Sequence, residues 1–469
     1  DRLYFDPLTT ECVAEILLRE GADGILLQFG GQTAINLALP LDDRMPHLSE
    51  QGLSCSMMGT SPDAVDEASD RERFEAFGKR SSIRLPNGRT GKTPAAIRAA
   101  VAEIGYPVLV RPSYVLGGRG MEILTDDAQL ETYMADAYIA PDKPLLVDEY
   151  LGGAIELDVD AVCDGEDVLV GAVMEHLEEA GIHSGDSTCF IPTQNVSEEI
   201  LTKVHEWTKE IGIGLNIRGC FNIQFCICKN ELYVLEVNPR GSRTFPFVAK
   251  ATGIPLARIA AHITIGDQLA DMEIPRRQTD VVSVKAPVFP FLKLRGLDPA
   301  PGPEMKSTGE VMGSHVDAAA AYLKARLATE LPVPTQGGVY LTVKDEDKGH
   351  LIPMARSLQE MGFTLHATQG TARHLRDVGC LDVETCYRIA EGQSPDALDL
   401  MRTGKIHLII NTPRNSGGAV LDGNMMRRLA VELNIPFVTT MSGAGMECRA
   451  IAVAQEGMPE PRRLIVDYI

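Results

Sequence analysis

The spacing of hydrophobic positions changes along the chain and predicts a mixture of helices and strands. Apolar side chains recur at helical spacing in residues 10–20, whereas residues 24–29 form a short apolar run typical of a strand. Helical spacing returns in residues 197–212 and 246–272. Residues 276–303 are rich in proline and are expected to be irregular. This pattern indicates a multidomain chain of α/β and α+β type.

The C-terminal part of the chain has the clearest alternation of strands and helices. Residues 329–337 combine Pro, Thr and Gly and indicate a linker. Beyond this linker, strand-like apolar runs alternate with helical periodicity, which predicts a small doubly wound domain. The expected strands are residues 338–343, 363–367, 406–411 and 436–440, and the expected helix after the first strand is 351–361.

Length and charge limit the class of protein. A chain of 469 residues is long enough for two to four domains. Its 65 acidic side chains exceed its 44 basic ones and give a net charge of −21, which argues against nucleic acid as the main partner. We take the acidity to favour solubility. No run approaches the roughly 18 apolar residues that would indicate a membrane span.

The cysteines and the first residues bear on the compartment. The ten cysteines lack metal-type spacing and indicate reduced, buried thiols of a cytoplasmic protein. The chain opens at Asp1 without a methionine and without signal-peptide character. We therefore expect it to be part of a longer protein.

The strand predicted before residue 238 carries the strongest candidate chemistry. Glu236 and Asn238 are two residues apart and therefore share one face of that strand. Gln224 lies on a neighbouring predicted strand and offers a third oxygen. Carboxylate and amide oxygens, completed by phosphate oxygens of a substrate, are ligands that Mg²⁺ prefers. Arg240 follows where an anionic co-substrate could bind; the alternative is a surface turn with an incidental acid.

A second group of residues suits a nucleotide. Arg111 ends a predicted strand, and Gly117, Gly118 and Gly120 follow in a loop whose N–H groups could bind phosphate. The apolar strand 145–151 is suited to pairing with an adenine edge.

The alternating segment after this strand adds a candidate for the ribose. Glu156, Asp158 and Asp160 share one face of a predicted half-buried strand. Glu156 is the candidate for ribose hydroxyls, and the two aspartates are expected to be solvated.

Three further motifs are ambiguous. The Gly30-Gly31 pair could bind phosphate, but a tight turn is the preferred interpretation. Residues 87–93 resemble a P-loop, yet Pro86 stands where the pattern requires Gly, so we expect an exposed loop. His183 lies in a polar, turn-rich segment and has either a structural or a functional role.

The predicted terminal domain offers a candidate anion site. Ligands of open α/β sheets bind beyond the carboxyl ends of the strands. Thr368 and Thr371 follow one predicted strand, and Asn411-Thr412 follow another, with Lys348 and Arg388 nearby in sequence. Such a site would suit a nucleotide monophosphate. The alternative is that Thr368-Gln-Gly-Thr371 only caps a helix.

Four segments together resemble the large chain of carbamoyl phosphate synthetase: LYVLEVNPRGSRTFPFVAKATG, VRPSYVLGGRGM, MEHLEEAGIHSGDS and GPEMKSTGEVMG. The resemblance is to its second, carbamate-phosphorylating half and covers nearly the whole chain. It implies a partial pre-ATP-grasp domain (1–63), an ATP-grasp domain (64–328), the linker 329–337 and a methylglyoxal-synthase-like allosteric domain (338–469).

The resemblance also implies roles for individual residues. The catalytic residues would be Arg111, Arg240, Arg243 and His183, with the two later arginines on the carbamate side. The metal ligands would be Gln224, Glu236 and Asn238. The nucleotide contacts would be Arg71, Arg111, Gly117, Gly118, Glu149, Leu151, Glu156, His183, Gln224 and Glu236, and the effector contacts Lys348, Thr368, Thr371, Arg388, Asn411 and Thr412. Glu178, Asp186 and Glu304 match acids that bind ornithine in the family, but Phe437 replaces a tyrosine of ornithine-responsive members.

The reaction implied by the resemblance is carbamate plus MgATP giving carbamoyl phosphate plus ADP, with two Mg²⁺ or Mn²⁺ ions at Glu236. It would serve glutamine- or ammonia-dependent synthesis for pyrimidines and arginine. The implied partners are the N-terminal half of the large chain, a glutaminase small subunit and a nucleotide monophosphate effector. Two alternatives are another ATP-grasp carboxylate–amine ligase or biotin-dependent carboxylase, and a nucleotide-sensing module without turnover.

Overall fold

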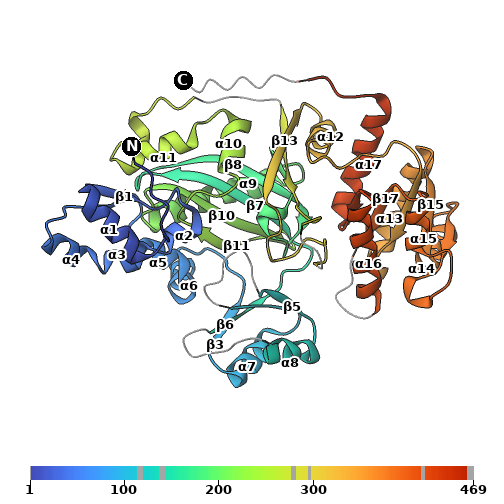
Figure 1. Cartoon of the computed structure of the whole chain (residues 1–469), viewed down its shortest axis with the longest axis horizontal. Helices are drawn as coiled ribbons and strands as arrows, with labels where there is room; N and C mark the ends of the chain where they lie inside the picture. Colours follow the sequence, from blue (N-terminus) through green and yellow to red (C-terminus); the bar gives the residue numbers. More distant parts are fainter. Residues whose placement is uncertain are drawn as a thin grey trace. The chain divides into compact units, whose positions relative to one another are not determined.

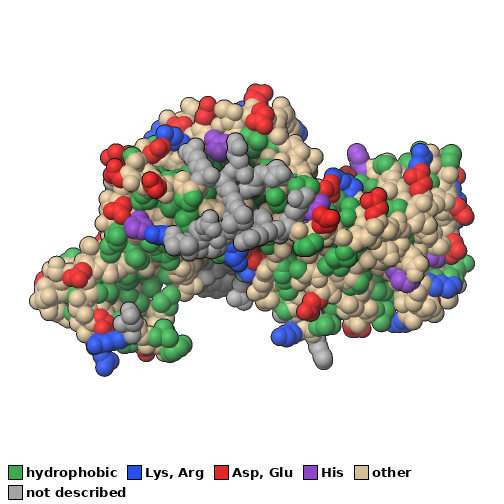
Figure 2. All heavy atoms as spheres, turned by 90° about the horizontal axis from the view of Figure 1, so that it is seen from above, with side chains coloured by type: hydrophobic (Ala, Val, Ile, Leu, Met, Phe, Trp, Pro, Cys, Tyr) green, Lys and Arg blue, Asp and Glu red, His purple; other side chains and the backbone are tan. Residues whose placement is uncertain are grey.

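The computed structural model describes residues 2–112, 120–136, 144–275, 281–293, 297–412 and 418–461. These residues form two compact units: unit 1 contains residues 2–175 and 191–275, and unit 2 contains residues 176–190 and 281–461. The elements are labelled in Figure 1. Among the described residues, no helix has both the length and the apolar character needed to cross a membrane. Acidic side chains are scattered over the face shown in Figure 2.

Unit 1 begins with a small α/β layer around two parallel strands, β1 and β2. The helix predicted over residues 10–20 is confirmed: the Thr9 hydroxyl accepts a hydrogen bond from the Cys12 N–H at its start, and Gly21 ends it with a φ of 59°. The elements are α1 (Thr10–Glu20), β1 (Gly24–Leu26), α2 (Gly31–Ile35), α3 (Ala38–Asp42), α4 (Met45–Glu50), β2 (Ser56–Met58) and α5 (Pro62–Ser69).

A small antiparallel sheet in the order β3-β6-β4-β5 follows. Helices α7 and α8 lie along it (Figure 1) and share its apolar core. The expectation of an exposed loop over residues 87–93 is wrong, because Gly88 and Gly91 are buried ends of strand β3. The elements are α6 (Arg71–Arg80), β3 (Gly88–Gly91), α7 (Pro94–Ile104), β4 (Val108–Pro112), β5 (Glu122–Leu124), α8 (Asp127–Asp136) and β6 (Leu145–Glu149).

The larger sheet of unit 1 places β7 between β10 and the first part of β8, with β11 beyond β10. Apolar residues of β7, β10 and β11 pack with α6 and α9 in one core, which includes Val159, Ile223 and Trp207. The helical stretch predicted over 246–272 is interrupted at Gly253 and Pro255 and forms two helices. The elements are β7 (Ile155–Cys163), β8 (Val168–Glu179), α9 (Glu198–Gly214), β10 (Gly219–Cys228), β11 (Glu231–Asn238), α10 (Phe245–Thr252), α11 (Leu256–Thr264) and η2 (Leu269–Asp271).

Unit 2 begins with the end of β8, followed in sheet order by β9, β12 and β13. The expectation that residues 276–303 are irregular is wrong in part, because β12 is a regular strand paired along its length with β13. The segment that carries His183, residues 175–186, was expected to be turn-rich, and this is wrong in part, since β8 runs to Glu179. The elements are η1 (Ser184–Asp186), β9 (Cys189–Ile191), β12 (Val282–Val288), β13 (Gly309–His315) and α12 (Ala318–Ala328).

The last part of unit 2 is a doubly wound parallel sheet in the order β16-β15-β14-β17-β18, which confirms the predicted alternation. Leu341 and its neighbours pack against α13, α14 and α17 on one face, and Tyr340 packs against α15 and α16 on the other. The elements are β14 (Gly338–Thr342), η3 (Asp345–Asp347), α13 (Lys348–Glu360), β15 (Thr364–Thr368), α14 (Gln369–Asp377), β16 (Glu384–Cys386), η4 (Ile389–Glu391), α15 (Ala397–Arg402), β17 (Leu408–Asn411), α16 (Gly418–Glu432), β18 (Phe437–Val438) and α17 (Met441–Glu456).

Candidate functional site

The predicted metal ligands meet on one face of the larger sheet in unit 1. The antiparallel register sets Gln224 of β10 directly opposite Glu236 of β11. Asn238 lies two residues farther along β11 and therefore shares this face. The side-chain amide of Asn238 donates a hydrogen bond to Glu236, with 2.7 Å between Nδ2 and Oε1. The predicted adjacency of these three residues is thus confirmed, although their metal binding stays a prediction.

The donor set on this face fits a hard divalent cation together with a phosphorylated substrate. It offers one carboxylate and two amide oxygens, whose total charge of −1 is too small to neutralise even one Mg²⁺ or Mn²⁺ ion. Phosphate oxygens would supply the missing charge. Within the described ranges, no cluster of three or more His, Cys, Asp or Glu side chains could hold a metal alone. The site therefore fits a metal that arrives with, or is completed by, nucleotide phosphate.

Two aspartates expected to be solvated are in fact buried beside this face. Asp158 is 2% exposed and Asp160 is fully buried, because both lie within the central strand β7 rather than on a half-exposed one. Asp160 accepts hydrogen bonds from the hydroxyls of Ser242 and Thr244, each at 2.7 Å. It also accepts one at 3.0 Å from the Asn222 amide. Asp160 thus anchors the segment that follows β11, a role that strand alternation alone did not reveal.

Burial raises the pKa of Asp160 from 3.8 to about 6, although its three hydrogen-bond donors oppose the rise. Between these values the folded state holds the proton more tightly than the unfolded chain does. The stability that this group contributes is therefore complete below pH 3.8 and is lost as the pH rises through 6. The rise in pKa from 3.8 to about 6 corresponds to about 3 kcal/mol.

We expect wild type to lose stability relative to Asp160→Asn as the pH is raised from 4 to about 7, because only wild type must ionise this buried group. The measurement is the difference between their melting temperatures at each pH. Asp43→Asn, at an exposed position, is the control and should show no such trend. A difference that stays constant, or that changes in favour of wild type, would contradict the assignment.

Two predicted phosphate-binding arginines converge on one carboxylate. Arg71 of α6 places its Nη2 2.9 Å from Oδ1 of Asp148, and Arg111 of β4 places its Nε 3.4 Å from Oδ2. Asp148 lies on β6 opposite Gly88, where a Cβ would come within 2.2 Å of Asp148 and of Arg71. Gly88, in the stretch that resembles a P-loop, therefore leaves room for the arginine–aspartate contact.

The remaining nucleotide residues of unit 1 lie on neighbouring elements. Glu149 ends β6, and its carboxylate accepts a hydrogen bond from the Asn87 amide at 3.1 Å. Leu151 and Glu156 are both buried, and Glu156 lies on β7 opposite Cys226. Arg243 is exposed and follows the turn after β11. Gly117 and Gly118 lie outside the described residues.

His183 belongs to unit 2, where it opens the short helix η1. Its Nδ1 accepts a hydrogen bond from the Gly185 N–H at 3.0 Å, and its own N–H donates to the Gly302 carbonyl at 2.8 Å. Asp186 in the same turn is buried and accepts hydrogen bonds from the N–H groups of Lys306 and Ser307. His183 therefore has a structural capping contact in this turn.

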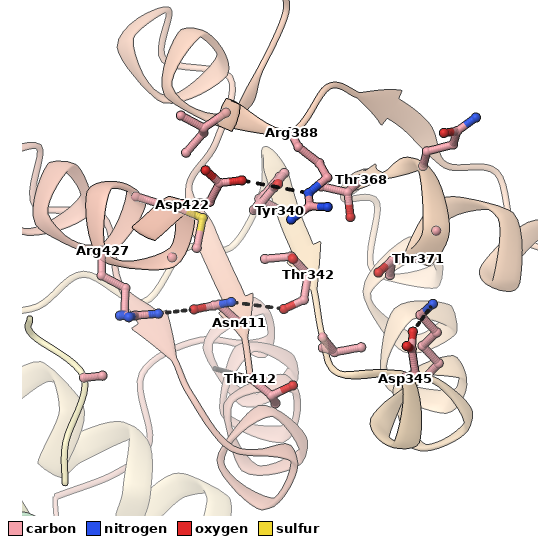
Figure 3. Close-up of a pocket in the computed structure, with 18 of the residues that line it drawn as sticks. Tyr340, Thr342, Asp345, Thr368, Thr371, Arg388, Asn411, Thr412, Asp422 and Arg427 are labelled. Carbon is pink, nitrogen blue, oxygen red and sulfur yellow. Dashed lines mark hydrogen bonds and ion pairs between the residues drawn. The ribbon is translucent and has the colours of Figure 1, made fainter. Parts of the chain in front are cut away.

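The six predicted effector residues line one cavity of about 430 Å³ in unit 2. Thr342, Thr368 and Asn411 mark the carboxyl ends of three neighbouring parallel strands at its centre. Figure 3 shows Thr368, Thr371 and Arg388 on one side and Asn411 and Thr412 on the other. The cavity lies where the strand order reverses between β14 and β17, the place expected for ligands of such sheets. The predicted convergence is confirmed; the effector itself stays a prediction.

The capping alternative for Thr368 is wrong as stated. Thr368 occupies the position before α14, but its side chain makes no capping hydrogen bond. Thr371 is 3% exposed and lines the cavity. Both hydroxyls therefore lie at the positive end of a helix, where an anion is stabilised.

Arg427 of α16 also lines the cavity and was not predicted from the sequence. It is almost fully buried, pairs with both carboxylate oxygens of Asp298 and donates a hydrogen bond to Oδ1 of Asn411. Asn411 in turn donates to the Thr342 carbonyl at 3.2 Å. The amide of Asn411 is therefore held on both sides by the protein. No local pattern in α16 distinguishes Arg427 from a surface arginine.

Comparisons with known proteins identify related sequences and a related fold. Three family models match: Carbamoyl phosphate synthase preATP-grasp domain over residues 1–67, Carbamoyl-phosphate synthase L chain, ATP binding domain over 70–272, and MGS-like domain over 350–439. The chain is 47% identical over 455 residues to a protein of Methanoregula boonei and 46% identical over 472 residues to one of Methanosarcina acetivorans, both named carbamoyl phosphate synthase large chain.

The chain spans less than half the length of these relatives. The matches cover 97% and 100% of this chain but only 42% and 44% of the two relatives. Among solved structures, a complex of biotin carboxylase from Campylobacter jejuni matches with a TM-score of 0.52 and 16% identity, over 68% of this chain and 77% of that chain. At this identity the likeness concerns the fold alone. Together these matches confirm the sequence resemblance and the predicted fold class.

Proposed function

The chain belongs to the carbamoyl phosphate synthase large-chain family, and from this premise we propose that unit 1 transfers a phosphoryl group from MgATP to carbamate. The observation that carries the proposal is the register of β10 and β11. It sets Gln224 opposite Glu236 and beside Asn238, with Arg240 directly after the strand. This is an oxygen-ligand cluster next to a cation, as transfer between two anions requires.

In the proposed reaction, a carbamate oxygen attacks the γ-phosphorus of ATP and the bond to the β–γ bridging oxygen breaks. The products are carbamoyl phosphate and ADP. The attacking oxygen is already anionic, so no general base is needed. Arg71 and Arg111 hold the phosphates, and Arg240 and Arg243 hold the carbamate side. Gln224, Glu236 and Asn238 would hold Mg²⁺ or Mn²⁺, which neutralises charge on the transferring group when bound.

The test of the proposal is ADP release that depends on both carbamate and Mg²⁺. The reverse reaction, ATP formation from carbamoyl phosphate and ADP, should also occur. Bicarbonate without ammonia is the control for a carboxylase-type activity and should give no comparable release. Nucleotide binding without any turnover would favour a sensing module, and turnover with other carboxylates alone would favour another ligase of this fold.

The supply of carbamate is also part of the proposal. The relatives contain more than half their length outside the matched region. We infer that the N-terminal half of the large chain makes carbamate, with ammonia from a glutaminase small subunit or from solution, in cytoplasmic synthesis for pyrimidines and arginine. Efficient synthesis from bicarbonate and ammonia by the 469-residue chain alone would contradict this division.

We further propose that the cavity in unit 2 binds a nucleoside monophosphate as an effector. Its volume of about 430 Å³ lies in the range of small-ligand sites. Lys348 and Arg388 line the cavity beside Asp345 and Asp422, and with the first turn of α14 they would bind a phosphate that replaces these carboxylate contacts. The buried hydroxyl of Thr371 can donate to a phosphate oxygen.

Thr371→Ala is expected to weaken uridine monophosphate binding at least tenfold, because a hydrogen bond to a charged group contributes about 1.5–3 kcal/mol. Isothermal titration calorimetry of wild type and variant measures the loss. Thr364→Ala, at the exposed start of β15, is the matched control and should bind like wild type. No binding to wild type, or equal binding to all three proteins, would leave the cavity without this ligand.

A further inference from the structure

The turn between β1 and α2 places Gln32 beside Arg240. Helix α2 contains only five residues, Gly31–Ile35. Gln32, in its first turn, accepts a hydrogen bond from Arg240, with 2.7 Å between Nε and Oε1. This contact joins residues separated by 208 positions. The glycine pair thus lies in the turn that follows β1 and brings Gln32 to the proposed carbamate arginine.

A second glutamine holds the backbone on both sides of Arg240. Gln28 is 2% exposed, and its amide nitrogen lies 3.2 Å from the Pro239 carbonyl. Its own carbonyl accepts a hydrogen bond from the Gly241 N–H at 3.0 Å. Gly59 leaves room for Gln28, since a Cβ there would meet Oε1 at 2.3 Å. The turn that carries Arg240 is therefore fixed to the N-terminal layer at its backbone as well as at its side chain.

The contacts of Arg240 leave part of its guanidinium for a ligand. Of its five N–H donors, the one on Nε is used by Gln32. One on Nη1 is used by the Gly241 carbonyl at 3.2 Å, and one on Nη2 by Oδ1 of Asn238 at 3.0 Å. Within the described part of the chain, one N–H on each terminal nitrogen remains for a ligand. Such a pair is suited to bidentate binding of a carboxylate or phosphoryl group.

We propose that Gln32 is a positioning residue that orients Arg240 toward the anionic acceptor substrate and leaves nucleotide binding unaffected. The inference rests on the proposed function and assigns a substrate-specific role to the N-terminal layer. A neutral acceptor suits this role because it fixes the guanidinium plane without cancelling its charge. The nucleotide arginines are anchored separately, by Asp148.

The test uses Gln32→Met, which keeps the side-chain size and removes the acceptor. We expect the KM for carbamate, and for carbamoyl phosphate in the reverse direction, to rise about tenfold, which corresponds to about 1.4 kcal/mol. The KM values for ATP and ADP should stay within about twofold. Gln32→Glu should also raise the carbamate KM, because a carboxylate there competes with the substrate for Arg240. Calorimetric titration with carbamoyl phosphate should show the same loss without turnover.

Thr33→Ala is the matched control, since Thr33 is exposed in the same short helix α2 and its loss should leave every KM unchanged. In an Arg240→Gln background, Gln32→Met should have no further effect on carbamoyl phosphate binding. Melting temperatures establish that each variant folds, and Gln32→Glu replaces Gln32→Met if the latter does not. If the KM values for all substrates rise equally, or if none rises, the inference about Gln32 is wrong. The proposed function is unaffected by that result as long as wild type shows carbamate-dependent ADP release. A wild type without carbamate-dependent ADP release would overturn both.

Discussion

Glu236→Gln is expected to lower turnover about a thousandfold, because a bound metal contributes several kcal/mol to transition-state charge stabilisation. Glu236 is the only carboxylate among the three predicted ligands, so the substitution leaves that set neutral. The side-chain size is kept, and the new glutamine can still accept the Asn238 hydrogen bond through its own Oε1 while Asn238 Oδ1 keeps its bond from Arg240. The measurement is carbamate-dependent ADP release at ordinary and at raised Mg²⁺, with circular dichroism to establish the fold.

Glu231→Gln is the matched control for this substitution. Glu231 opens the same strand, is 47% exposed and pairs with Arg84 at 2.8 Å on the surface. Exposed ion pairs contribute little, so this variant should retain nearly all of the turnover. Near-normal turnover of Glu236→Gln at ordinary Mg²⁺ would show that Glu236 does not hold the metal.

The second large effect is expected at the arginine pair. Arg111→Ala should weaken ATP binding or slow transfer by about 10- to 150-fold, the equivalent of about 1.5–3 kcal/mol for a hydrogen bond to a charged group. Arg111 is 26% exposed and has Asp148 beside it, so it is held in place yet accessible to a ligand. ATP titration and the rate at saturating carbamate measure the two contributions.

The contact of both arginines with Asp148 leads to a prediction about the double variant. Because Arg71 and Arg111 both contact Asp148, their substitutions should not be additive, and Arg71→Ala with Arg111→Ala should lose less than the sum of the single losses. Arg98→Ala, in helix α7 beside the same small sheet, is the control, since its ion pair with Glu131 is about half exposed. If Arg111→Ala has the same ATP affinity and transfer rate as wild type, Arg111 has a purely structural role.

Much of the candidate metal site followed from local pattern. Alternation in a strand placed Glu236 and Asn238 on one face, and the register then set Gln224 opposite Glu236. The helix over residues 10–20 was also predictable, because Thr9 and Gly21 supply its start and end within one short segment. In the same way, the turn residues after β15 and β17 indicated a site that the structure places around one cavity.

Other features depended on which strands became neighbours. Alternation identified the shared face of Asp158 and Asp160 but not its burial, which follows from the position of β7 between β8 and β10. From the sequence, residues 87–93 resemble a polar loop. In the structure β3 pairs with β6, and Gly88 leaves room for the Arg71 side chain. Burial of a polar strand is a property of the whole sheet, which no single segment encodes.

The sequence by itself therefore determined which side chains share a strand face and where several helices begin and end, because these depend on residues within a few positions. Only the tertiary structure decided that Gln32 supports Arg240, that Asp148 joins Arg71 to Arg111, and that Arg427 holds Asn411. Gln32 and Arg240 are 208 residues apart, and their hydrogen bond requires that the two segments meet in the folded structure. Polar side chains without a local periodicity acquire their partners through packing, and their roles follow from it.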